Sequence, residues 1–125
     1  NRAEFLKILL EASGRDLSVN RNRSGFSDVD EQAWYAPYVR YARFNGIIEG
    51  YSDGTFRPDQ AINYAEGLKI IYFTLQVPTA DVAGAWYERY LRHALANDVL
   101  FDTAVAMDQP VPRQDTVWML WRLIE

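Results

Sequence analysis

The fold of this chain is decided by the stretch Ser27–Glu66, which reads SDVDEQAWYAPYVRYARFNGIIEGYSDGTFRPDQAINYAE. An acidic turn, a tryptophan, an aromatic amphipathic segment, a glycine, a tight turn and a newly capped helix follow one another in that order. Fragments of the same order recur on both sides of the stretch. A chain that repeats a supersecondary unit is typically a scaffold with surface grooves. We therefore expect a groove-binding protein rather than an enzyme.

Composition sets the outer limits of this expectation. The chain has 125 residues, 49% of them hydrophobic, which is enough to build one globular domain. The net charge of -4 argues against a nucleic-acid partner, and the absence of cysteine excludes disulfides and thiolate zinc sites. No apolar run reaches membrane-spanning length and no secretory signal is present, so we expect no membrane insertion. The chain opens at a helix start, so we expect a fragment of a longer protein.

Five helices are predicted, and they are of two types. Buried helices, apolar on nearly every side, are predicted over Arg2–Ala12, Tyr64–Leu75 and Arg113–Ile124. Amphipathic helices are predicted over Ala36–Asn45 and Ala83–Asn97. Asparagine caps and acids three residues later mark two of the starts, at Asn1 with Glu4 and at Asn63 with Glu66. Trp118 and Trp121 are assigned to the core because they lie on a buried helix.

The amphipathic helices repeat one another. Trp86, Tyr90, His93, Ala94 and Asn97 match Trp34, Tyr38, Tyr41, Ala42 and Asn45 at a constant offset. Three buried helices with peripheral amphipathic ones predict an all-α fold, a three-helix bundle with pseudo-threefold symmetry and short irregular arms. The short pattern Asn22-Arg23-Ser24 is a glycosylation sequon.

The residues that repeat also carry a family resemblance. Phe26-Ser27-Asp28-Val29 through Trp34, Gly46–Tyr51, Asp53–Pro58 and the helix opening Asn1–Lys7 resemble S-layer homology motifs. The resemblance implies three repeats within one domain, at residues 1–20 (the second half of the first repeat), 26–77 and 81–125. On this interpretation, the outer helix of the first repeat lies upstream.

That resemblance implies a function. In the family, grooves between neighbouring motifs bind pyruvylated secondary cell-wall polysaccharide, and the arginine of the helix-opening signature helps to hold the acidic sugar. Arg2 and Arg113 occupy this signature position, whereas Tyr64 replaces the arginine in the middle motif. The third motif also lacks the Asp53–Pro58 pattern and is three residues shorter. We therefore expect an extracellular anchoring module associated with the cell wall.

The candidate ligand-binding residues share this resemblance: Arg2, Glu4, Trp34, Asp53, Gly54, Arg57, Tyr64, Trp86 and Arg113. A guanidinium can clamp a carboxylate, but a first-turn arginine can equally be solvated or paired. Trp34 and Trp86 are either sugar-stacking platforms or, as we favour, packing anchors of the outer helices.

No residue pattern supports catalysis or a cofactor. Glu4, Glu66 and Asp115 are interpreted as helix caps, and the only histidine, His93, as a packing residue in the place of a tyrosine. The acids Asp28, Asp30 and Glu31 lack the pattern of a calcium loop, so capping or solvation is expected. Alternatively the repeats are degenerate, and the domain binds another surface protein or a second copy of itself.

Overall fold

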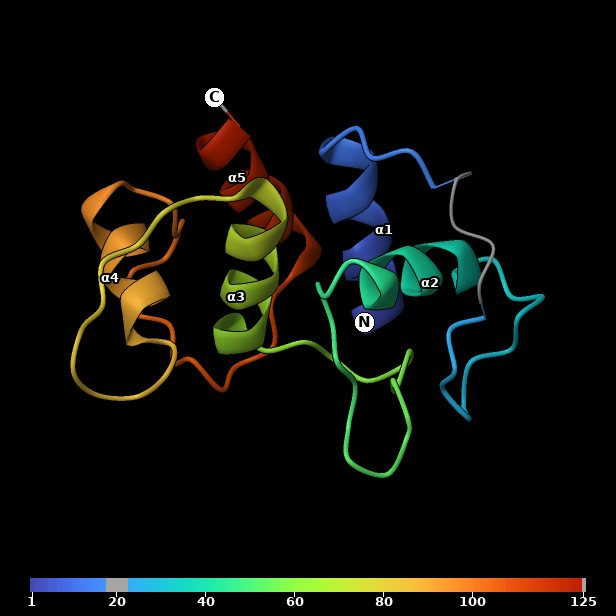
Figure 1. Cartoon of the computed structure of the whole chain (residues 1–125). Coiled ribbons are helices and arrows are strands. Elements are labelled where there is room, and N and C mark those ends of the chain that lie inside the picture. Colours follow the sequence, from blue (N-terminus) through green and yellow to red (C-terminus); the bar gives the residue numbers. More distant parts are fainter. Residues whose placement is uncertain (18–22, 125) are drawn as a thin grey trace. The chain divides into compact units, whose positions relative to one another are not determined.

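The computed structural model describes residues 1–17 and 23–124, and these residues form five helices without a strand (Figure 1). The helices are α1 (Arg2–Ala12), α2 (Ala36–Phe44), α3 (Tyr64–Leu75), α4 (Glu88–Ala96) and α5 (Arg113–Ile124). The all-α prediction is confirmed. The chain divides into two compact units, unit 1 (Asn1–Ala61) and unit 2 (Ile62–Glu125).

Unit 1 packs α1 against α2. Asn1 caps α1 through its side chain, which accepts from the Glu4 amide at 2.9 Å in a complete capping box, as predicted. The predicted apolar residues of α1 are buried, among them Phe5, Leu6, Leu9 and Leu10. Helix α2 begins at Ala36-Pro37, because a proline in the first turn has no amide to leave unsatisfied.

Unit 2 packs α3 against both α4 and α5. Asn63 caps α3 by accepting from the Glu66 amide at 2.9 Å, and Gln76 ends the helix in the left-handed conformation, with φ 56°. The Tyr72 hydroxyl lies 2.7 Å from Nδ1 of His93, whose ring meets the Tyr72 ring edge to face. His93 is therefore a packing residue, as predicted.

Two sequence predictions are wrong in unit 2. Helix α4 begins at Glu88 rather than Ala83, because Gly84 takes a φ of +114° and Trp86-Tyr87 form a turn before the helix. Trp121 is 49% exposed and Trp118 is half-buried, so neither belongs to the core. In α5 the buried positions are taken by Asp115, Thr116, Met119 and Leu120 instead.

Each unit contains an irregular arm that returns to the start of a helix. We call residues 47–61 the first arm and residues 99–111 the second arm. The pseudo-threefold bundle and the three repeat boundaries stay predictions, and residues 18–20 of the first repeat, like Asn22 of the sequon, lie outside the described residues. Within the described ranges, no helix is both long and apolar enough to cross a membrane.

Candidate functional site

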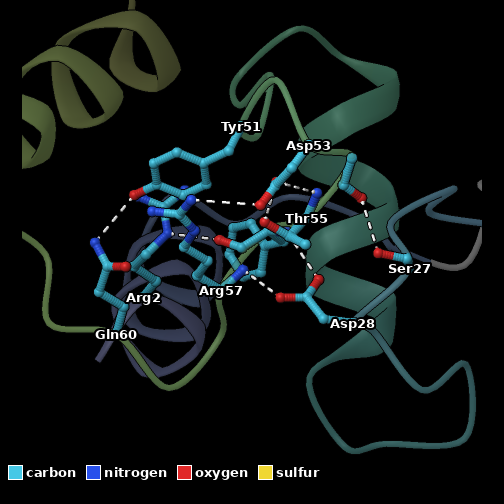
Figure 2. Close-up of polar contacts among 10 residues, drawn as sticks. Arg2, Ser27, Asp28, Tyr51, Asp53, Thr55, Arg57 and Gln60 are labelled. Carbon is cyan, nitrogen blue, oxygen red and sulfur yellow. Dashed lines mark hydrogen bonds and ion pairs between the residues drawn. The ribbon is translucent and has the colours of Figure 1, made fainter.

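The first arm is held by a carboxylate from the turn before α2. Asp28 accepts from the backbone amides of Phe56 at 2.8 Å and Arg57 at 2.7 Å (Figure 2). Arg57 has a φ of 61°, in the left-handed region that non-glycine residues rarely adopt. Two charge-assisted bonds to one carboxylate offset this strain and fix the direction of the arm.

The tip of the first arm is a tight turn built on Asp53. Its Oδ1 accepts from the Thr55 hydroxyl at 2.6 Å and the Thr55 amide at 3.1 Å, while Gly54 takes a φ of +83°. The Thr55 hydroxyl, followed by the Thr55 amide and Arg57, lowers the pKa of Asp53. The Asp53, Gly54 and Arg57 side of this arm is exposed.

Arg2 lies under the first arm rather than on the surface. Only 3% of it is exposed, and its Nε donates to the Phe56 carbonyl at 2.9 Å. Its guanidinium carbon lies 4.8 Å from the Phe56 ring centroid and 5.2 Å from that of Tyr51. The guanidinium carbon of Arg57 lies 3.7 Å from the centroid of the same Tyr51 ring (Figure 2). Arg2 thus ties α1 to the arm that precedes α3 in the sequence.

The amides at two helix starts are occupied by the arms. Arg2 N donates to Gln60 O at 2.9 Å, and Ala3 N donates to Pro58 O at 3.1 Å. In unit 2, Tyr64 N donates to Gln109 O at 3.1 Å and Ala65 N to Met107 O at 3.0 Å. These donors are therefore not available to hold ligand oxygens.

The remaining signature residues of unit 2 are split between core and surface. Tyr64 is buried, and its hydroxyl donates to Oδ2 of Asp115. Burial of the hydroxyl is the main cause that raises the pKa of Tyr64, and the hydrogen bond to Asp115 raises it further. Asp115, the acid in the first turn of α5, is 7% exposed and receives this bond within the core. Arg113 is exposed at the start of α5.

The acids before α2 also have partners. Asp30 accepts from the Gln32 amide at 2.9 Å, and Glu31 accepts from the Ser24 amide at 2.7 Å and pairs with Arg40 at 3.4 Å. Among the described residues no group of three or more potential ligands converges on a metal position.

The clearest repeated surface feature is an exposed tryptophan beneath a lysine. Lys7 of α1 places Nζ 5.7 Å from the Trp34 ring centroid, and the Tyr35 ring meets Trp34 edge to face at 5.4 Å. In unit 2, Lys69 of α3 places Nζ 5.6 Å from Trp86, and Tyr87 meets that ring at 5.7 Å. We call these two groups, Lys7–Trp34–Tyr35 and Lys69–Trp86–Tyr87, the platforms.

The platforms correct one interpretation and add two residues. Trp34 is 54% exposed and Trp86 is 57% exposed, so neither ring is buried as a packing anchor would be. Lys7 and Lys69 are the only lysines of the chain, and sequence reasoning missed both. Their equivalent places in two capped, buried helices were the signal that could have revealed them.

Fold and surface together define a class: a small helical domain built from repeated units, each with an exposed cationic aromatic surface. Residues 25–66 match the S-layer homology domain. S-layer homology sequence is therefore detected over residues 25–66, as the resemblance predicted. Domains of this family are non-catalytic and anchor proteins at the cell surface.

The proteins to which this chain is similar are surface proteins. The chain is 34% identical to Cell surface glycoprotein 1 of Acetivibrio thermocellus over 65% of its length, and 26% identical to the Cellulosome-anchoring protein of the same organism over 99%. It is 29% identical to a Surface layer protein of Brevibacillus choshinensis over 68%. The chain spans 4%, 32% and 8% of these relatives, respectively. They indicate a cell-surface location.

Proposed function

We propose that this domain anchors its parent protein non-covalently to an anionic, pyruvylated cell-wall polysaccharide. The observation that carries the proposal is the platform, which occurs once in each unit with the same three residue types. An exposed tryptophan face is a general binding surface for the apolar C–H face of a sugar ring. The family supplies the cell-surface setting, and the platforms supply the chemistry.

The lysine gives each platform its preference for an acidic sugar. An ammonium group next to the ring attracts the carboxylate of a pyruvyl ketal while the ring covers the sugar to which the ketal is attached. Lys7 and Lys69 are both exposed, so their attraction for a carboxylate is screened by salt. Binding should therefore weaken as ionic strength rises, but should not vanish, because stacking is insensitive to salt.

The other candidate residues take two roles in this proposal. Arg57 and Arg113 are exposed arginines that can add charge-assisted hydrogen bonds to the glycan. The remaining candidates act on the ligand only indirectly, because they hold the helix starts and the first arm in place. They are Arg2, Glu4, Asp53, Gly54 and Tyr64.

Two platforms on one chain suit a repeating polymer. Each site alone binds a single acidic unit weakly, because one stacked ring and one screened charge supply little free energy. Attachment of one unit raises the local concentration of the next, so the chain holds a polymer more firmly than an isolated unit.

The experiment is co-sedimentation of the domain with purified cell walls. We expect it to pellet with untreated walls and to stay in solution after mild acid has removed the pyruvyl ketals. Lys7→Gln with Lys69→Gln should reduce pelleting, whereas Lys7→Arg with Lys69→Arg should preserve it. Equal pelleting with treated and untreated walls would contradict the proposal.

One observation favours the alternative, a protein-interaction or self-assembly module. Helix α5 exposes a set of apolar side chains, Val117, Trp121 and Ile124, each about half accessible. Size-exclusion chromatography with light scattering at several concentrations tests self-assembly. A dimer that Trp121→Ser converts to a monomer would support it, and a monomer at every concentration would exclude a second copy as the partner.

A further inference from the structure

A small hollow lies beside the first turns of α5. It has a volume of about 180 Å³ and is lined by Phe101, Gln114, Asp115 and Trp118. Phe101 comes from the second arm, and the other three residues come from α5. The rings of Phe101 and Trp118 meet at 77°, with centroids 5.2 Å apart, so they form an aromatic corner. We call this the α5 hollow. Neither platform contributes a residue to it.

The α5 hollow is lined in part by the nearly buried carboxylate of Asp115. Asp115 is 7% exposed, and Oδ2 accepts from the neutral hydroxyl of Tyr64. Buried carboxylates are costly unless a positive charge accompanies them. A cation that entered the hollow would offset this cost.

The surroundings of Asp115 also favour a cation. Asp102, at the start of the second arm, acts together with Asp115 to raise the pKa of Tyr64, so two acids contribute negative potential at this place. Aromatic rings attract cations through their faces, and a corner of two rings beside a carboxylate is a general arrangement for recognising ammonium groups. The hollow is thus suited to a cation and not to an acidic sugar.

Two polar groups that line the hollow can form hydrogen bonds with hydroxyl groups of a ligand. Nε1 of Trp118 is buried and has no hydrogen-bond partner among the described residues. Native proteins rarely leave such a donor unsatisfied, and a water or a hydroxyl oxygen of a molecule bound in the hollow would supply the acceptor. The amide of Gln114 can both donate and accept. A simple alkylammonium ion would satisfy Asp115 but neither of these groups.

We propose that the α5 hollow binds a protonated amino sugar, a 2-amino-2-deoxyhexose whose amine is not acetylated. The ammonium group pairs with Asp115, the ring C–H face covers the Phe101–Trp118 corner, and hydroxyl oxygens reach Trp118 Nε1 and Gln114. A cavity of this volume is small for a drug-sized ligand and suits a single sugar ring. The assignment rests on the proposed function only in taking the cell-wall glycan as the source of this sugar.

The test is an NMR titration of the intact domain that follows the tryptophan indole N–H signals. The chain has only four tryptophans, and Trp118→Phe identifies the signal of Trp118 by its loss. Glucosamine should shift this signal saturably. N-acetylglucosamine should bind about tenfold more weakly or worse, because the acetylated nitrogen carries no charge.

Variants separate this site from the platforms. Asp115→Asn keeps an acceptor for the Tyr64 hydroxyl and should weaken glucosamine binding about tenfold, while the pyruvylated disaccharide still binds. Asp108→Asn, an exposed acid of the second arm, is the matched control and should change nothing. If Asp115→Asn lowers the melting temperature, Phe101→Ala tests the same site through its exposed wall.

Three results would overturn the proposal. Equal binding of glucosamine and N-acetylglucosamine would make the hollow a neutral-sugar site. Equal binding of glucosamine and Nα-acetyl-lysine amide would assign it to a protein side chain. No shift with glucosamine would mean that the hollow takes no amine. A failure of disaccharide binding at the platforms leaves each of these readouts intact, so the two proposals fail separately.

Discussion

The two arms return to their helices through the same backbone hydrogen bonds, and the first arm is also fixed by side-chain hydrogen bonds from other segments, whereas the side-chain bonds of Asp102 and Gln109 lie within the second arm. Pro58 and Gln60 accept from the amides of α1, and Met107 and Gln109 accept in the same spacing from those of α3. In the first arm Asp28 and Arg2 add three bonds of 2.7 to 2.9 Å. In the second arm, the bonds to α3 and one from Val111 N to Ile62 O are all between backbone atoms.

The comparison teaches that backbone register persists after most of the side-chain signature has gone. The matched family region, residues 25–66, contains the Asp53–Pro58 pattern, and the second arm keeps only its aspartate: Asp102 Oδ1 accepts from the Ala104 amide at 2.9 Å, as Asp53 Oδ1 accepts from that of Thr55. In the register that pairs Trp34 with Trp86, alanine at 80 stands where unit 1 has Asp28. Capping of a helix start by an arm therefore does not depend on the residues that make the arm recognisable.

The largest expected effect is in the core of the first arm. Phe56 is 1% exposed and packs on Phe26 with ring centroids 5.7 Å apart, so Phe56→Ala should cost about 3–5 kcal/mol of unfolding free energy. The register of the arms places Val105 in the same position of unit 2, where it is only half-buried. Val105→Ala should cost about 1 kcal/mol or less. Urea unfolding followed by circular dichroism measures both. Equal losses would mean that the two arms are equally well packed.

A smaller effect is expected at Asp28, whose carboxylate holds the first arm. Asp28→Ala removes the acceptor of the Phe56 and Arg57 amides and leaves Arg57 in its left-handed conformation, so we expect a loss of about 1–3 kcal/mol. Ala80→Asp in unit 2 should change stability by only about 0.5 kcal/mol or less, because the second arm is held by its backbone bonds and by Asp102 and Gln109 within it. Hydrogen exchange at the Phe56 and Arg57 amides should accelerate in the first variant. Unchanged protection of both amides would contradict this role for Asp28.

The smallest effect concerns pH and the tip of the first arm. Because the pKa of Asp53 is lowered in the folded state, ionised Asp53 stabilises the turn above the ordinary aspartate pKa of about 4. This contribution is lost as the pH falls through the folded-state pKa. Thr55→Val should raise the pKa of Asp53, since it removes the hydroxyl donor. Carboxyl-carbon NMR titration measures both values, and identical titration of the variant would show that the hydroxyl plays no part.

Helix starts and stops were readable from the sequence because local chemistry determines them. The boundaries of α1, α3 and α5 follow from asparagine caps, a preceding proline and the length of the apolar pattern. The start of α4 was misplaced because Ala83–Tyr87 continues the amphipathic pattern. The turn before α2, at the matching place in unit 1, would have corrected it.

Burial and long-range partners were less readable, because they depend on which segments meet. Nothing local to Arg2 shows that its guanidinium lies beneath Phe56, and nothing local to Asp28 shows that it binds an arm nearly thirty positions along the chain. Trp121 has the spacing of a core residue but lies on the exposed side of α5. The ligand roles of the nine candidate residues stay predictions.

The most direct test of the anchoring proposal reads the two platforms separately. Reductive methylation with ¹³C-formaldehyde keeps the charge of lysine and labels only Lys7 and Lys69 among the side chains. Lys7→Arg and Lys69→Arg assign the two signals. On titration with a pyruvylated cell-wall disaccharide, we predict that both signals shift saturably, that Trp34→Ala and Trp86→Ala each abolish one shift, and that Phe44→Ala abolishes neither. Saturable binding of the disaccharide with both lysine signals unmoved, or no binding by the folded domain, would contradict the account.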